Sequence, residues 1–145
     1  MFKAKDIATY FLSLSEPDAG DVLTHLKLQK LCYYAQGFSI AINDTPLFDD
    51  PIEAWDHGPV VPSLYHEFKK YGSGALPVLQ AEFGVNYDDN TKELLNEIYN
   101  IYGQFSAWKL RNMTHEESPW IDAFKSDDPL ISHDALKDYF KEQLV

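Results

Sequence analysis

Apolar side chains recur at intervals of three and four residues along most of the chain, the period of an amphipathic helix. This spacing predicts a first helix from Lys5 to Leu14. The longest helix is predicted from about Thr24 to Ile42, and Thr24 can cap the free amides at its start. Capping residues and prolines predict further helices that begin near Pro62, Asn90, Ser106, Thr114 or Ser118, and Ser132.

The segment from Leu47 to Val61 is the least helical part of the chain, because prolines interrupt it. Ile52 to Trp55 is predicted as one short strand, with Leu47 and Phe48 pairing nearby. Alternating residues from Ala81 to Tyr87 give a weak edge-strand signal. The pattern as a whole predicts a mainly α fold, a compact bundle of six or seven helices with a very small β element.

The composition fits one globular domain. The chain has 145 residues, of which 45% are hydrophobic, enough for a sizeable core, and we expect residues 1–145 to form a single domain. No apolar run approaches the roughly 18 residues of a membrane span. The amino terminus lacks a signal-peptide pattern, and the lone Cys32 cannot form an internal disulfide. These features favour the reducing cytoplasm.

The chain is strongly acidic. Its formal net charge is −11, from 23 acidic and 12 basic side chains. Such a surface repels phosphate backbones, so we expect no nucleic-acid ligand, and it attracts basic protein surfaces. Two alternatives stay open: the acids serve solubility alone, or the chain is a mimic of DNA that occupies a nucleic-acid-binding protein.

Motifs for catalysis are absent from the sequence. There is no G-x-S-x-G elbow, phosphate-binding loop or H-x-x-x-H pair. Cys32 lies on the apolar stripe of a predicted helix, which favours an inert buried thiol. We therefore predict no catalytic residue, metal or cofactor. One enzymatic alternative stays open, a metal-dependent hydrolase built on His57, His115 and Asp56.

The segment from Trp55 to Pro62 is the most unusual in the chain. Gly58 can adopt backbone angles closed to other residues, and two prolines bracket a pair of valines. A loop with so little freedom loses little entropy when a partner docks, which is typical of a binding element. The alternative is a turn between strand and helix whose Trp55 and valines belong to the core.

Three blocks of sequence resemble a known family. The first is Leu26-Lys27-Leu28-Gln29-Lys30-Leu31-Cys32-Tyr33-Tyr34-Ala35-Gln36-Gly37. The second combines Pro46-Leu47-Phe48, Ile52-Glu53-Ala54-Trp55, Gly58-Pro59-Val60-Val61-Pro62 and Leu64-Tyr65, and the third combines Thr114-His115 and Pro119-Trp120. In order and spacing the blocks resemble the Panacea antitoxin domain, also described as SocA-like or as the phage-associated GepA type.

The resemblance implies a mainly helical antitoxin of a bacterial toxin–antitoxin system, often carried on a prophage. Such a protein neutralises its cognate toxin by direct contact. A SocA-type alternative is an adaptor that delivers the toxin to a bacterial protease. Many relatives carry a DNA-binding helix-turn-helix domain, and we expect no separate one here. The oligomeric state stays open, with a homo-oligomer compatible with the sequence.

The family supplies no contact residues that can be transferred, so the expected partner-binding site rests on the matched loop and the helix behind it. His115 and Trp120 are interpreted as a structural pair. The residues expected to bind the partner are Gln29, Lys30, Trp55, His57, Gly58, Pro59, Val60, Val61 and Tyr65.

Overall fold

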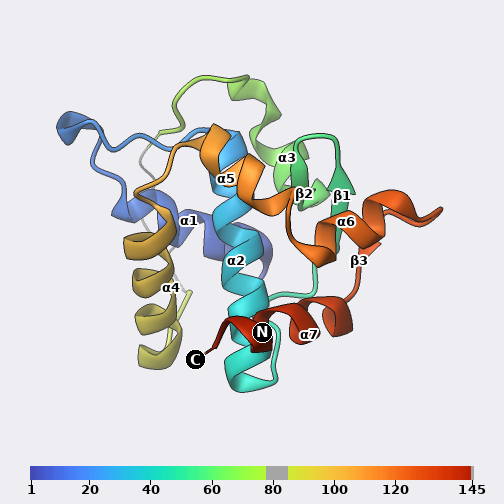
Figure 1. Ribbon diagram of the computed structural model, residues 1–145. Helices are drawn as coiled ribbons and strands as arrows, with labels where there is room; N and C mark the ends of the chain where they lie inside the picture. Colours follow the sequence, from blue (N-terminus) through green and yellow to red (C-terminus); the bar gives the residue numbers. More distant parts are fainter. Residues whose placement is uncertain (78–84, 145) are drawn as a thin grey trace.

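Helices dominate the computed structural model, which describes residues 1–77 and 85–144. This confirms the predicted mainly α fold. Seven α-helices lie in these ranges (Figure 1): α1 (Ala4–Leu14), α2 (His25–Asn43), α3 (Pro62–Phe68), α4 (Asp89–Tyr102), α5 (Ala107–Thr114), α6 (Ser118–Lys125) and α7 (His133–Gln143). Short 3-10 turns lie at Pro17–Ala19 and Lys69–Tyr71. Residues 81–84 of the segment with a weak strand signal lie outside the described residues.

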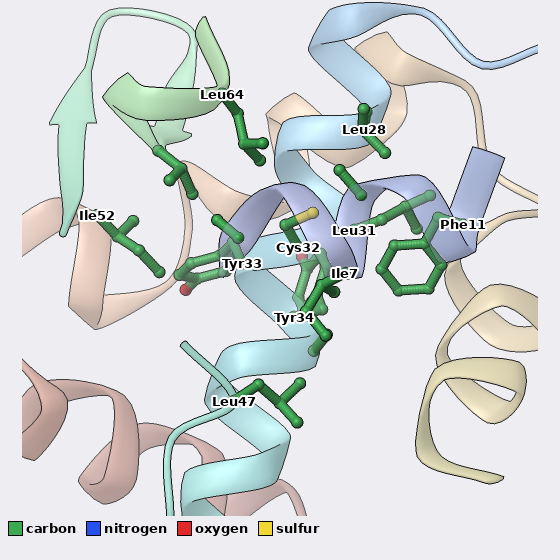
Figure 2. Close-up of a cluster of buried hydrophobic side chains, with 14 of the residues drawn as sticks. Ile7, Phe11, Leu28, Leu31, Cys32, Tyr33, Tyr34, Leu47, Ile52 and Leu64 are labelled. Atoms are coloured by element: carbon green, nitrogen blue, oxygen red, sulfur yellow. The ribbon is translucent and has the colours of Figure 1, made fainter. Parts of the chain in front are cut away.

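The central helix α2 organises the core. It runs through the middle of the molecule in Figure 1, with α4 on one side and the small sheet on the other. Its side chains Leu28, Leu31 and Cys32 are fully buried beside Ile7 and Phe11 of α1 (Figure 2). Burial also raises the pKa of the Cys32 thiol, in accord with the interpretation of Cys32 as a buried thiol. Fully burying one such apolar side chain stabilises the fold by roughly 1.5–3 kcal/mol.

The β element is a three-stranded antiparallel sheet with the order β2-β1-β3. The predicted strand from Ile52 to Trp55 is confirmed as β1 (Ile52–Trp55), which pairs with β2 (Gly58–Val60) and with β3 (Leu130–Ile131). Phe48 does not join this sheet, because its partner is Phe2 in an isolated parallel bridge. The sheet closes one side of the core rather than forming a layer of its own.

Capping residues explain most of the helix starts. Thr24, Ser106 and Ser132 cap α2, α5 and α7 through their hydroxyl oxygens, as predicted. The predicted cap of α4 is wrong: Asp88 accepts the Thr91 amide, and Asn90 lies inside the helix.

Neither residue proposed as the cap of α6 holds that position. Thr114 ends α5 and donates its hydroxyl hydrogen to the Arg111 carbonyl, while Ser118 is already the first helical residue. The N-cap is Glu117, although its side chain makes no capping bond. That carboxylate accepts hydrogen bonds from Tyr33 and Tyr34 instead.

Within the described ranges, no helix is long and apolar enough to cross a membrane.

Candidate functional site

A tight turn joins β1 to β2 and exposes Asp56 and His57 to solvent. Gly58 follows with φ 109°, a positive angle that suits glycine at the end of such a turn. A Cβ atom on Gly58 would lie 2.7 Å from Lys30 Cε and 2.8 Å from Thr114 Oγ1. The turn therefore needs glycine twice, for its backbone angle and for the close approach of α2 and α5.

The long helix holds the loop from behind. The Val61 amide donates to Gln29 Oε1 at 2.7 Å, and Gln29 Nε2 lies 3.3 Å from the Val61 carbonyl oxygen, to which it donates. Lys30 Nζ donates to the Pro59 carbonyl oxygen at 3.3 Å. The expected packing of α2 behind the loop is thus confirmed. Two consecutive helix residues fix the backbone of the segment that follows the turn.

Lys30 is an unusual support, because its side chain is fully buried. Burial, together with the nearby Arg111, lowers the pKa of Lys30 to about 7. A carbonyl oxygen is the hydrogen-bond acceptor that the structure gives its ammonium group. The Pro59 carbonyl oxygen thus satisfies the buried amine of Lys30, and Lys30 in turn fixes the backbone of the loop at Pro59.

The residues expected to bind a partner divide into an inner and an outer set. The outer residues have accessible side chains: His57 is exposed, Tyr65 is 38% exposed and Trp55 is half-buried. The inner residues are buried, so they have almost no surface with which to touch a partner, and they support the loop. They are Gln29, Lys30, Gly58, Pro59, Val60 and Val61. Val60 and Val61 are therefore core residues, as in the alternative in which the segment is a turn between strand and helix.

A cleft of about 790 Å³ opens beside the turn. We call it the hairpin cleft. Trp55, Tyr65 and Phe124 contribute aromatic side chains to its lining, and Gln29 and Val60 also line it. Phe124 is 44% exposed, so the cleft presents apolar surface to solvent next to the acidic turn. Polar side chains such as His25, Gln29 and Asp56 also line it, and apolar and aromatic surface combined with polar groups is the usual character of a binding site.

One wall of the hairpin cleft is ordered by ring contacts around Tyr65. The Tyr65 ring meets the Trp55 ring edge-on at 5.1 Å between centroids and stacks on His25 at 5.5 Å. Gln29 Nε2 lies 2.8 Å from His25 Nε2, and the Val61 bond to Gln29 Oε1 makes the amide nitrogen the donor. His25 must then accept and be neutral, in accord with burial and Lys30, which lower its pKa.

Phe124 of the hairpin cleft belongs to a stack of three rings. His115 stacks on Trp120 at 4.0 Å, and Trp120 stacks on Phe124 at 4.5 Å. Trp120 Nε1 donates to the Trp55 carbonyl oxygen at 2.8 Å, which ties α6 to the hairpin. The interpretation of His115 and Trp120 as a structural pair agrees with this stack. Phe124 is its outer member and the one that lines the hairpin cleft.

A buried acid lies between α2 and α6. Glu117 is 7% exposed and accepts hydrogen bonds from the hydroxyls of Tyr33 and Tyr34, each at 2.9 Å. Burial raises the pKa of Glu117 to about 7, although both tyrosine bonds favour the carboxylate. This arrangement explains why the side chain is not free to cap α6. It locks the position of the helix that carries Trp120 and Phe124.

The described residues contain no cluster of three or more His, Cys, Asp or Glu side chains that could hold a metal ion. The hydrolase alternative required His57, His115 and Asp56 to converge. In the structure His115 lies beside the turn, but its ring is stacked on Trp120 and its contact with Asp56 is to the backbone, whereas His57 and Asp56 are exposed. Within residues 1–77 and 85–144, that alternative finds no ligand set.

Three residues of the site escaped sequence reasoning. Phe124 appeared only as an apolar residue of a short helix, and nothing local indicated that it would face solvent. His25 follows the cap of α2, where its packing against Tyr65 depends on a segment forty residues away in sequence. Glu117 lies three residues after Thr114, the spacing of a capping box, which suggests a local role for its side chain. Its true partners, Tyr33 and Tyr34, are adjacent in the sequence, but their pairing with Glu117 is a long-range contact.

Comparison with known proteins identifies the chain's relatives. Residues 28–121 match the family model described as "Antitoxin SocA-like, Panacea domain". The chain is also similar to Antitoxin SocA of Caulobacter vibrioides, with 29% identity over 121 residues. That alignment covers 75% of this chain and 64% of the relative, so the chain spans less than two thirds of the relative's length. No solved structure matches the chain. The match extends from Leu28 in the first turn of the supporting helix α2, through the hairpin, to Ile121 in α6, and the chain belongs to the SocA-like antitoxin family with the Panacea domain.

Proposed function

We propose that this protein is the antitoxin of a bacterial toxin–antitoxin system and neutralises a protein toxin by binding it at the hairpin cleft. One observation carries the choice of surface: exposed aromatic side chains converge on a cleft whose backbone is fixed from behind by Gln29 and Lys30. Tyrosine and tryptophan at a preorganised surface are typical centres of binding energy. The role is binding, and the place of action is the cytoplasm.

The acidic surface supports the choice of partner chemistry. A net charge of −11 accelerates the approach of a basic protein and repels acidic competitors. Asp56 lies in the turn at the edge of the hairpin cleft, so negative charge is available beside the aromatic lining. We therefore expect a toxin with a basic surface around an apolar anchor.

Co-expression tests the function. The protein encoded by the gene next to this one in its operon is expressed from an inducible promoter, with and without this chain. The proposal predicts that the neighbour alone stops growth, that co-expression restores growth, and that the two proteins co-purify. A toxic neighbour that is neither rescued nor retained would contradict direct neutralisation.

A control separates binding from altered expression. Tyr65→Ala shortens an exposed side chain of the hairpin cleft, whereas Trp108→Ala shortens one that is 58% exposed and does not line the hairpin cleft. At equal protein levels, Tyr65→Ala should weaken rescue and Trp108→Ala should preserve it. Equal rescue by both variants would place the toxin elsewhere on the molecule.

A further inference from the structure

A second apolar groove lies between α2 and α4. It has a volume of about 410 Å³ and shares no lining residue with the hairpin cleft. In Figure 1, α4 and the hairpin lie on opposite sides of α2. We call this site the α2–α4 groove; it is lined mainly by Phe38, Ile42, Leu94, Ile98, Ile101 and Tyr102.

Apolar surface is exposed along this groove. Ile42 is 55% exposed, Ile101 is 43% exposed and Leu144, at the end of the last helix, is 42% exposed. Single exposed apolar residues are ordinary on a soluble protein, but here they converge on one groove. Such a patch is a candidate contact for another macromolecule.

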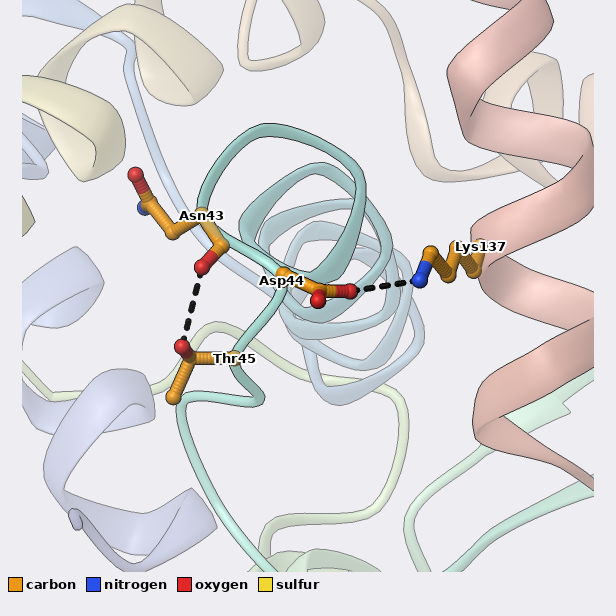
Figure 3. A network of polar contacts seen from close by, with 4 residues as sticks. All are labelled: Asn43, Asp44, Thr45 and Lys137. Atoms are coloured by element: carbon orange, nitrogen blue, oxygen red, sulfur yellow. Dashed lines mark hydrogen bonds and ion pairs between the residues drawn. The ribbon is translucent and has the colours of Figure 1, made fainter.

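The charge at the groove is of one sign. Glu93 and Glu97 line it one helical turn apart, and none of the described residues that line it is a lysine or arginine. In the parts of the chain that the structure describes, no ion pair joins either glutamate to a base. At the nearby end of α2 the situation differs: Lys137 neutralises Asp44 at 2.6 Å (Figure 3). The free negative charge thus lies on the α4 side of the groove.

The form of the groove favours a helix as its occupant. Both walls are α-helices, whose backbone groups are already hydrogen-bonded, so an incoming strand would find no backbone partners. An amphipathic helix needs only apolar contacts, which side chains spaced three and four apart supply. A second copy of this chain is disfavoured, since it would bring another net charge of −11 against the two glutamates.

We propose that the α2–α4 groove docks an amphipathic helix of a partner protein whose apolar face is bordered by lysine or arginine. Apolar side chains of that helix fill the space above Leu94 and Ile98, and its bases approach Glu93 and Glu97. This contact is separate from the hairpin cleft, so it does not depend on the proposed function of that cleft.

Model peptides test the proposal on the intact chain. The probes are two synthetic helices of about 14 residues with the same leucine stripe, one flanked by lysine and the other by glutamate. Binding is followed by amide and methyl NMR shifts. The lysine-flanked peptide should perturb Ile42, Leu94, Ile98 and Ile101, and the glutamate-flanked peptide should bind at least about tenfold more weakly.

Two variants locate the contact. Ile101→Asp should weaken the lysine-flanked peptide about tenfold or more, and the pair Glu93→Gln and Glu97→Gln should weaken it several-fold. The matched control is the pair Glu116→Gln and Asp122→Asn, which removes two exposed charges outside the groove and should change binding less than about twofold. Thermal melts confirm that each variant is folded.

Several results would overturn the proposal. These are equal binding of the two peptides, no binding, shifts confined to the hairpin cleft, or an equal loss with the control pair. Sedimentation analysis tests the remaining occupant, because a dimer that Ile101→Asp converts to a monomer would assign the groove to self-association. A monomeric chain that binds the lysine-flanked peptide as described supports the proposal.

Discussion

Gln29 and Val61 are joined by both polar groups of the Gln29 side chain: Oε1 accepts the Val61 amide at 2.7 Å, and Nε2 donates to the Val61 carbonyl oxygen at 3.3 Å. Two hydrogen bonds therefore connect the Gln29 side chain to the backbone of a residue 32 positions further along the chain. Because Gln29 is only 2% exposed, water cannot replace these bonds without local opening. This contact turns the loop after the hairpin into part of the rigid core.

Removing this contact should cost stability. Gln29→Met keeps the length of the side chain but leaves the buried Val61 amide without its acceptor, which should lower the free energy of unfolding by about 1–3 kcal/mol. The Val61 carbonyl oxygen keeps the Leu64 and Tyr65 amides as donors. Urea unfolding measures the change. Gln104→Met is the control, because Gln104 is exposed and should change stability by less than about 0.5 kcal/mol. An equal effect of the two substitutions would contradict the role of the contact.

The turn glycine offers a second test. Gly58→Ala forces a Cβ atom against Lys30 and Thr114 at a φ of 109°, so we expect a loss of about 1–3 kcal/mol in unfolding free energy. Gly74→Ala is the matched substitution, since its Cβ would meet only the Tyr71 carbonyl oxygen at 3.5 Å, an ordinary contact. If Gly58→Ala were as stable as Gly74→Ala in thermal melts, the packing behind the turn would be refuted.

Glu117 makes stability depend on pH in a defined direction. Its raised folded-state pKa of about 7 means that the native state binds more protons than the unfolded state between about pH 4.5 and 7. The stability that protonated Glu117 contributes is therefore lost as pH rises through that window. His25 and His115, whose pKa values are lowered, act in the opposite sense, so the contribution must be read from a variant.

The comparison is between the natural chain and Glu117→Gln. The unfolding free energy of the natural chain minus that of the variant should fall by on the order of 3 kcal/mol from pH 4.5 to 7.5. Urea titrations at several pH values measure it. A difference that is constant with pH, or that increases, would show that this carboxyl is not held in a costly environment.

Lys30 should produce the opposite slope at higher pH. Its pKa is lowered to about 7, so between about pH 7 and 10 the unfolded state binds the proton that the native state lacks. Stability should rise with pH through this range, and Lys30→Met should abolish that rise. The same urea titrations, extended to pH 10, measure the difference between the natural chain and the variant. A difference that does not change from pH 7 to 10 would indicate that the buried amine remains charged.

The sequence predicted the features that depend on neighbours along the chain. The bounds of α1 and α2, the strand from Ile52 to Trp55 and the caps Thr24, Ser106 and Ser132 follow from periodicity and local capping. The prediction of the α4 cap failed because Asp88 and Asn90 can both accept a hydrogen bond from a helix amide. In the structure the Thr91 amide donates to Asp88. Strand β3 was missed because its two residues form a strand only through pairing with β1.

The candidate site was predicted as a segment but not as a surface. Gly58 and the bracketing prolines indicated a loop, whereas the structure places Gly58–Val60 in strand β2. The sequence could not indicate that Val60 and Val61 face inward, because that depends on the contact of α2 with the loop. Phe124 was missed for the related reason that the orientation of α6 is set by Glu117, Tyr33 and Tyr34, which are distant in sequence.

Calorimetric titration of the neighbouring gene's protein into this chain tests whether the hairpin cleft binds the toxin. We expect the double variant Tyr65→Ala and Phe124→Ala, which removes exposed side chains of the hairpin cleft, to weaken binding about tenfold or more in Kd while the chain stays folded. The double variant Trp108→Ala and Val22→Ala removes exposed apolar side chains outside the cleft and should change the Kd less than about threefold. Equal affinities for the natural chain and the cleft variant would show that the toxin does not bind at the hairpin cleft.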